Sequence, residues 1–205
     1  MGLDIKKFKA SALNCFKQKN KLFLKNSSIN MSNVLNRGKI KNLIFVNYLP
    51  ELNEFFFWCQ QLIAESLGKK NKGFLPFVST APRDHHSLLQ LYLDGPSDKI
   101  FNIFSLRSKK KKNIINFKDN NFNFLKGKGL NEIKIAQKNA LIQSLKKNKI
   151  PFREIEISEI NEGTLGELFS YFMLETAIIG KLLNINPFDQ PAVEEVKIST
   201  KQLLT

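Results

Sequence analysis

Short apolar runs alternate along the chain with segments whose apolar residues recur every three or four positions. The first run, Ile40–Leu49, has an apolar centre typical of a strand covered on both faces. Pro50 ends that strand, and Glu51–Leu67 shows helical spacing before Gly68, a residue that favours helix termination. The pattern therefore predicts a strand followed by a helix.

This alternation continues to the C-terminus. Asp84 is expected to cap the second helix, and Asp189 with Pro191 resembles a capped start for the last one. The helix expected over Leu130–Asn148 has lysines on an outward basic face and apolar residues on the other side, namely Ile133, Ala136, Ala140, Leu141 and Leu145. The further expected elements are strands Phe74–Val78, Ile100–Leu106 and Arg153–Ile157, helices Asp84–Gly95 and Leu165–Leu183, and a final helix through Val193, Val196 and Leu203.

Strands alternating with helices predict an α/β fold, a doubly wound and mainly parallel sheet with a long C-terminal helical segment. In such folds ligands bind at the carboxyl ends of the strands. The 205 residues suit one domain, and 42% hydrophobic residues supply a core. No apolar run approaches the roughly 20 residues of a membrane span, and nothing resembles a secretion signal, so we expect a cytoplasmic protein.

Charge and cysteine content narrow the classes of partner. The net charge of +14 favours anionic partners such as phosphorylated metabolites. Nucleic acid is disfavoured, because only four basic residues are arginine and the dense block Lys109–Lys112 lies within 108–123, an Asn- and Lys-rich stretch expected to be a mobile surface insertion. Cys15 and Cys59 have no metal-ligand spacing and are expected to be ordinary semi-buried cysteines.

Gln61 and Glu65 are four positions apart, so they share one face of their predicted helix. Glu65 also falls in the last turn, where the helix dipole disfavours an anion and so suits a general base. The alternative is a solvent-facing glutamate at a fraying helix end.

His85 and His86 lie at a strand-to-helix junction, where the helix dipole favours neutral imidazole. Adjacent side chains diverge on a helix, so we expect one of the two, at most, to enter a cleft. The alternative is a pair of surface histidines beside a cap.

Gln190 and Lys197 are two helical turns apart, with Glu194 on the same stripe. Together they could bind a sugar hydroxyl or a phosphate. The alternative is an exposed lysine among many.

The motifs around these residues, taken in order, resemble the C-terminal part of the glucose-6-phosphate isomerase family. Phe188–Lys197 is close to aromatic-Asp-Gln-x-Gly-Val-Glu-x-x-Lys, with Ala192 where the family usually has glycine. Gln60–Lys69 is similar to the family's Gln-Gln…Glu-Ser-x-Gly-Lys helix, and Asp84–Gly95 to its Asp-Gln-His-Ser…Gln…Gly segment, with His85 where glutamine is common. The similarity extends through 166–177 and covers essentially the whole chain.

The resemblance implies the second sugar-isomerase (SIS) domain of a homodimer that interconverts glucose 6-phosphate and fructose 6-phosphate through a cis-enediol. Glu65 would be the base, and Lys197 and His86 would assist ring opening, the histidine being lent across a dimer interface. Gln61 and Gln190 would hold sugar or phosphate oxygens. No metal, cofactor, nucleic acid or membrane is implied.

Family members are longer, and their first SIS domain carries a Ser/Thr-rich phosphate loop and a Gly-Gly-Arg motif that this sequence lacks. The resemblance therefore implies a C-terminal fragment with little activity alone. Two other functions compete with it: a non-catalytic SIS module that binds a sugar phosphate, and a basic nucleic-acid binder.

Overall fold

The structure is a computed structural model that describes residues 2–107 and 120–205. Lys109–Lys112 and most of the expected insertion at 108–123 lie outside the described residues, and a short helix, η3 (Asn120–Leu125), follows. The chain divides into two compact units and crosses between them inside helix α3 and strand β2. The first unit comprises 1–41, 58–76 and 161–205, and the second 42–57 and 77–160.

The second unit contains a four-stranded sheet. Its order is β2-β1-β3-β4, and β1 pairs in parallel with β3, as does β3 with β4. The strands are β1 (Asn42–Asn47), β2 (Leu75–Thr80), β3 (Lys99–Leu106) and β4 (Phe152–Ile157). The expected α/β fold with a mainly parallel sheet is confirmed. Three of the strands follow from apolar runs, and β4 follows from the alternation of apolar and charged residues over Arg153–Ile157.

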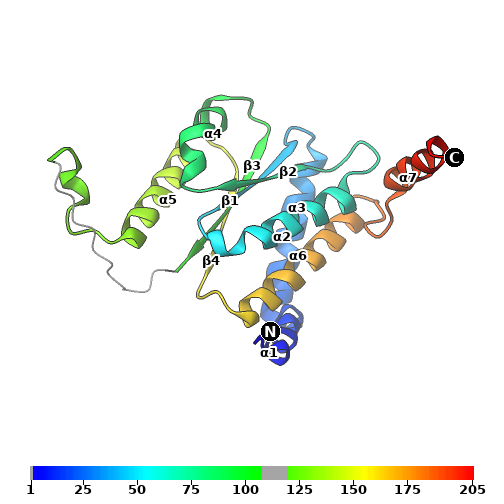
Figure 1. The fold of residues 1–205 in the computed structure, drawn as a ribbon, viewed down its shortest axis with the longest axis horizontal. Helices are drawn as coiled ribbons and strands as arrows, with labels where there is room; N and C mark the ends of the chain where they lie inside the picture. The colour runs from blue at the N-terminus through cyan, green and yellow to red at the C-terminus, as the bar shows by residue number, and fades with distance from the viewer. Residues whose placement is uncertain (1, 108–119) are drawn as a thin grey trace. The chain divides into compact units, whose positions relative to one another are not determined.

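Apolar side chains project from both faces of this sheet. On one face Ile44 and Phe101 join a core completed by helices α4 (Arg83–Asp94) and α5 (Leu130–Lys147) (Figure 1). On the other face, the ring centroids of Phe104 and Phe56 lie 4.6 Å apart. Phe56 belongs to α3 (Asn53–Leu67), which follows the short helix η2 (Pro50–Leu52). Strands of a doubly wound sheet are expected to be buried on both sides in this way.

Helix α5 confirms part of the expected division into an apolar and a basic face, since Leu141 and Leu145 are buried, and corrects the rest. Ala136 and Ala140 are exposed, whereas Lys138 is buried and donates hydrogen bonds to Glu154 (2.5 Å) and Glu156 (2.8 Å) of β4. Small alanines gain little from burial, and a lysine is buried when carboxylates pair with it. The helical period was right, but the pairing partners lie too far along the sequence for the pattern to show.

The start of α4 also differs from expectation, since Asp84 is not the N-cap. Pro82 precedes the helix, and Asp84 lies in its first turn. The buried Asp84 carboxylate accepts a hydrogen bond from the Thr80 backbone N–H at 2.8 Å, so it joins the helix to the end of β2.

The first unit is mainly helical. It contains α1 (Ile5–Ala12), η1 (Leu13–Phe16), α2 (Gln18–Asn36), residues 58–67 of α3, α6 (Glu162–Leu182) and α7 (Pro191–Leu203). Three of its helices, α1, η1 and α2, come from a stretch for which the pattern predicted no element. Helix α6 packs against both α1 and α2 (Figure 1). Gly166 allows this approach, because a Cβ there would lie 2.2 Å from the backbone oxygen of Phe8.

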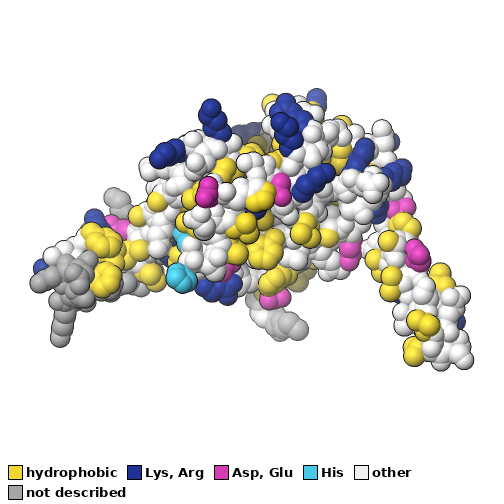
Figure 2. Space-filling view, turned by 90° about the horizontal axis from the view of Figure 1, so that it is seen from above, with side chains coloured by type: hydrophobic (Ala, Val, Ile, Leu, Met, Phe, Trp, Pro, Cys, Tyr) yellow, Lys and Arg dark blue, Asp and Glu magenta, His cyan; other side chains and the backbone are white. Residues whose placement is uncertain are grey.

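Helix α7 differs from the others, because all of its residues, 191–203, are exposed. The exposed fraction is 66% for Val196 and 86% for Leu203, and apolar atoms are visible on this helix in Figure 2. Across residues 2–107 and 120–205, no helix has the length and apolarity that a membrane span requires.

Candidate functional site

Glu65 occupies the last turn of α3, as its distance from Gly68 predicted. Cys59, Ile63 and Leu67 are buried at intervals of four, which fixes the orientation of the helix. Gln61 and Glu65 are on a different stripe, where Gln61 is exposed and Glu65 is half-buried. The carboxylate is therefore held by a packed helix and remains accessible.

Two amides hold this carboxylate. The Nε2 of Gln61 donates to Glu65 Oε1 at 2.9 Å, and the Nε2 of Gln190 donates to Glu65 Oε2 at 2.7 Å. Each oxygen thus receives one N–H, and an ionised carboxylate offers about four lone-pair sites. The arrangement fixes the plane of the carboxylate and leaves lone pairs that can accept a proton from a ligand. It brings together three of the five residues predicted for the site.

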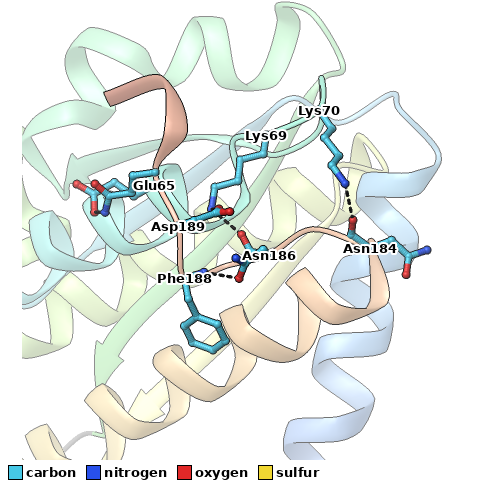
Figure 3. Close-up of polar contacts among 8 residues, drawn as sticks. Glu65, Lys69, Lys70, Asn184, Asn186, Phe188 and Asp189 are labelled. Atoms are coloured by element: carbon cyan, nitrogen blue, oxygen red, sulfur yellow. Dashed lines mark hydrogen bonds and ion pairs between the residues drawn. The ribbon is translucent and has the colours of Figure 1, made fainter. Parts of the chain in front are cut away.

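Gln190 reaches the Glu65 carboxylate through the connection between α6 and α7, residues 183–190, which is hydrogen-bonded to the loop after α3. Lys69 donates to the Asn186 backbone oxygen at 2.6 Å and to Asp189 Oδ1 at 2.9 Å, as Figure 3 illustrates. Lys70 and Lys72 donate to the backbone oxygens of Asn184 (3.3 Å) and Leu183 (3.0 Å). The hydrogen bond from Lys69, assisted by its charge, lowers the pKa of the Asp189 carboxyl.

Lys197 lies on α7 and forms an ion pair with Glu194 at 2.6 Å, both side chains being more than half exposed. Among the described residues, its hydrogen bond goes to Glu194 and not to Glu65 or Gln190. The expected stripe of Gln190, Glu194 and Lys197 is present in part, since Gln190 is the N-cap of α7. A role for Lys197 in ring opening stays a prediction.

His86 belongs to the second unit, in the first turn of α4, and is exposed. Its neighbour His85 is half-buried, and its Nε2 shares a hydrogen bond of 2.9 Å with the Tyr48 hydroxyl. Burial lowers the pKa of His85, against a smaller opposing effect of Asp84. The two imidazoles differ in burial, and the role of His86 stays a prediction.

Sequence reasoning missed the part played by Lys69 and Asp189. Both stand inside the motifs that carry the resemblance, at the end of Gln60–Lys69 and near the start of Phe188–Lys197. Opposite charges in two separate motifs were a usable signal, but nothing in the sequence indicated that the two motifs meet. Across the described residues, no three His, Cys, Asp or Glu side chains lie close enough together to hold a metal ion.

Curated relatives bear out the resemblance. A probable glucose-6-phosphate isomerase from Methanococcus maripaludis is 39% identical over 170 residues, covering 83% of this chain and 38% of that protein. The glucose-6-phosphate isomerase from Methanocaldococcus jannaschii is 36% identical over 203 residues, covering 96% of this chain and 50% of that protein. The chain spans half or less of the length of these relatives. No protein-family model matches it.

Solved structures share the fold. A hypothetical protein from Thermus thermophilus aligns with a TM-score of 0.88 and 23% identity, covering 100% of this chain and 51% of that one. A glucose-6-phosphate isomerase from Chlamydia trachomatis aligns with a TM-score of 0.76 and 17% identity, covering 97% and 41%. These likenesses concern the fold, whereas the sequence relatives connect the chain to the isomerases.

Proposed function

We propose that this relative of glucose-6-phosphate isomerases is the second SIS domain, with the C-terminal helices, of a cytoplasmic homodimeric isomerase. Its substrates are glucose 6-phosphate and fructose 6-phosphate. The observation that carries the proposal is the carboxylate of Glu65, held at both oxygens by the amides of Gln61 and Gln190.

Moving a proton between adjacent sugar carbons requires one base that both accepts and returns it. Glu65 suits this role because its carboxylate is fixed in plane, half-buried and not engaged by a cation among the described residues. The amides of Gln61 and Gln190 also carry oxygens that can accept hydrogen bonds from sugar hydroxyls. A single carboxylate between two neutral amides therefore suits proton transfer on a hydroxylated substrate.

Ring opening needs an acid and a base at the ring oxygen and the C1 hydroxyl. The imidazole of His86, exposed in the first turn of α4, and the side-chain amine of Lys197 can serve as this pair, one giving a proton to the ring oxygen and the other taking the proton of the C1 hydroxyl. His86 would act in the site of the partner subunit. For Lys197 the bound substrate would replace Glu194 as the hydrogen-bond acceptor.

The test is a chimera in which this chain replaces the matching half of the Methanocaldococcus jannaschii enzyme, which it matches over 203 residues. We expect fructose 6-phosphate to be converted to glucose 6-phosphate, as followed by a coupled assay. Glu65→Gln keeps the shape of the side chain but cannot take the proton, so turnover should fall about 10²- to 10⁴-fold with substrate binding preserved.

Glu54→Gln, on the exposed first turn of the same helix, is the matched control and should leave turnover unchanged. An inactive chimera, or a Glu65→Gln variant with near-normal turnover, would contradict the proposal. The 205-residue chain alone should show little or no turnover, because positioning and enediolate stabilisation would be lost with the absent motifs.

A further inference from the structure

We propose that Lys69 is a positioning residue that acts through Asp189 to hold Gln190 against Glu65. The inference rests on the proposed function, because Glu65, the residue against which Gln190 is held, is the base proposed there. Its geometry rests on contacts within the first unit, and Figure 3 shows Glu65 and Lys69 beside the connection that carries Asp189.

The position of Lys69 suits it to this role. It directly follows Gly68 at the end of α3, four residues after Glu65, and its side chain is 12% exposed. Its ammonium has two acceptors on the connection, Asp189 Oδ1 at 2.9 Å and the Asn186 backbone oxygen at 2.6 Å. An ammonium so withdrawn from water, bound to a charged acceptor and a carbonyl, holds its partners more firmly than an exposed pair does.

The two cross-links join the same two segments. Lys69 bonds to Asp189 at one point, and Glu65 bonds to Gln190 at the next residue of the chain. One link alone leaves the start of α7 free to rotate about it, whereas two adjacent links fix its direction. Loss of the Lys69 link should therefore weaken the Glu65–Gln190 hydrogen bond.

Helix α7 depends on such polar contacts, because its residues 191–203 are all exposed and bury no apolar side chain within the described part of the chain. Lys70 and Lys72 bind the backbone at the end of α6, at Asn184 and Leu183, several residues before Gln190. They secure the beginning of the connection. Lys69 secures its end, where Gln190 lies.

The experiment follows the side-chain amide of Gln190 by ¹H–¹⁵N NMR in the 205-residue chain, with its signals assigned from Gln190→Ala. Lys69→Met and Asp189→Asn should each shift these signals toward those of an exposed glutamine and speed their exchange with solvent. Lys70→Met is the matched control and should leave them in place. Because Lys69 acts through Asp189, the double variant should show no larger shift than either single variant.

Asp189 is 53% exposed, so Asp189→Asn tests the link without disturbing a packed region, even where Lys69→Met lowers stability. Unchanged Gln190 signals in Asp189→Asn would overturn the proposal, as would shifts in the double variant that equal the sum of the single ones. The measurement does not use turnover. An inactive chimera would therefore contradict the proposed function, and unchanged Gln190 signals would contradict the positioning role.

Discussion

Gln190 lies 125 positions after Glu65 in the chain, and its Nε2 donates a hydrogen bond to Glu65 Oε2 at 2.7 Å. The contact unites two motifs that the sequence presents as separate helices. Gln61 completes the arrangement from within α3. The two amides therefore differ in how they reach the carboxylate, one by local helical spacing and the other by the course of the chain.

Replacing Gln190 should reduce catalysis far more than it reduces stability. In the chimera, Gln190→Ala should lower kcat/KM roughly fivefold or more, since a hydrogen bond to a charged group contributes ~1 kcal/mol or more. The residue is exposed, so the free energy of unfolding of the 205-residue chain should change by less than ~0.5 kcal/mol in urea. Gln202→Ala, also exposed on α7, should change neither quantity, and a Gln190→Ala variant with unaltered kinetics would contradict the role of this amide.

The strands and the buried helices could be predicted from the sequence, because their apolar periodicity is strong. The run around Phe45 and the helical spacing that includes Phe55, Cys59 and Ile63 predicted β1 and α3 nearly to their ends. Such elements are buried by their own residues, so the local pattern carries the information.

Helix α2 shows why part of the fold could not be predicted. Two of its buried positions are Ser28 and Ser32, whose hydroxyls donate to the backbone oxygens of Leu24 (2.8 Å) and Ile29 (2.9 Å). Small hydroxyl side chains satisfied within the helix can line a packed face, but in a hydrophobicity pattern they count as polar. The serines therefore interrupt the apolar stripe that Leu24, Met31 and Leu35 would otherwise form.

The site could be predicted as a set of residues but not as an arrangement. Gln61 and Glu65 were paired by helical spacing, whereas the contact of Glu65 with Gln190 depends on where α6 ends and how the connection to α7 returns. The same limit applies to Lys138, whose partners lie 16 and 18 positions away on β4. Periodicity shows which face of an element is buried, whereas long-range polar pairs determine which other element packs against that face.

Adding one methyl group at Gly166 should destabilise the helices of the first unit. In Gly166→Ala, the new Cβ would meet the Phe8 backbone oxygen at 2.2 Å, and a backbone atom cannot rotate away. Overpacking of this kind costs about 1–3 kcal/mol. At a helix position with free space, alanine would instead be more stable than glycine by roughly 0.5–1 kcal/mol. Urea unfolding followed by circular dichroism measures the difference.

Gly163→Ala provides the matched control on the same helix. Its Cβ would come within 3.0 Å of the Ser11 hydroxyl, the end of a side chain that can move. The loss of stability should therefore be clearly smaller than at Gly166. Equal losses at the two positions would contradict the close approach of α1 and α6 at Gly166.

Removing the charge of Lys138 should leave two carboxylates side by side on one face of β4 without a cation. Lys138→Met should lower the free energy of unfolding at neutral pH by about 1–3 kcal/mol, because Glu154 and Glu156 lose their shared partner. Lys146→Met, at an exposed position of α5, should have little effect. A Lys138→Met variant as stable as the parent at neutral pH would contradict the structural importance of this ion pair.

The same variant should show a distinct pH dependence. The hydrogen bond from Lys138 lowers the pKa of Glu156 in the folded protein. The resulting stability is present above the pKa of the unfolded glutamate, about 4.3, and is lost as the pH falls through the folded-state pKa. The stability difference between parent and Lys138→Met should therefore shrink in acid, and urea unfolding at a series of pH values measures it.

His85 should make the second unit less stable in mild acid. Burial lowers its pKa in the folded protein, so the unfolded chain takes up the proton first as the pH falls. The contribution of neutral His85 to the free energy of unfolding is complete above about pH 6.5 and is lost as the pH falls through the folded-state pKa.

His85→Gln removes the titration, while its amide can still bond to the Tyr48 hydroxyl. This variant should therefore lose less stability than the parent between about pH 8 and about pH 5. Identical pH profiles for the parent and His85→Gln would contradict the loss of stability expected from protonation of His85.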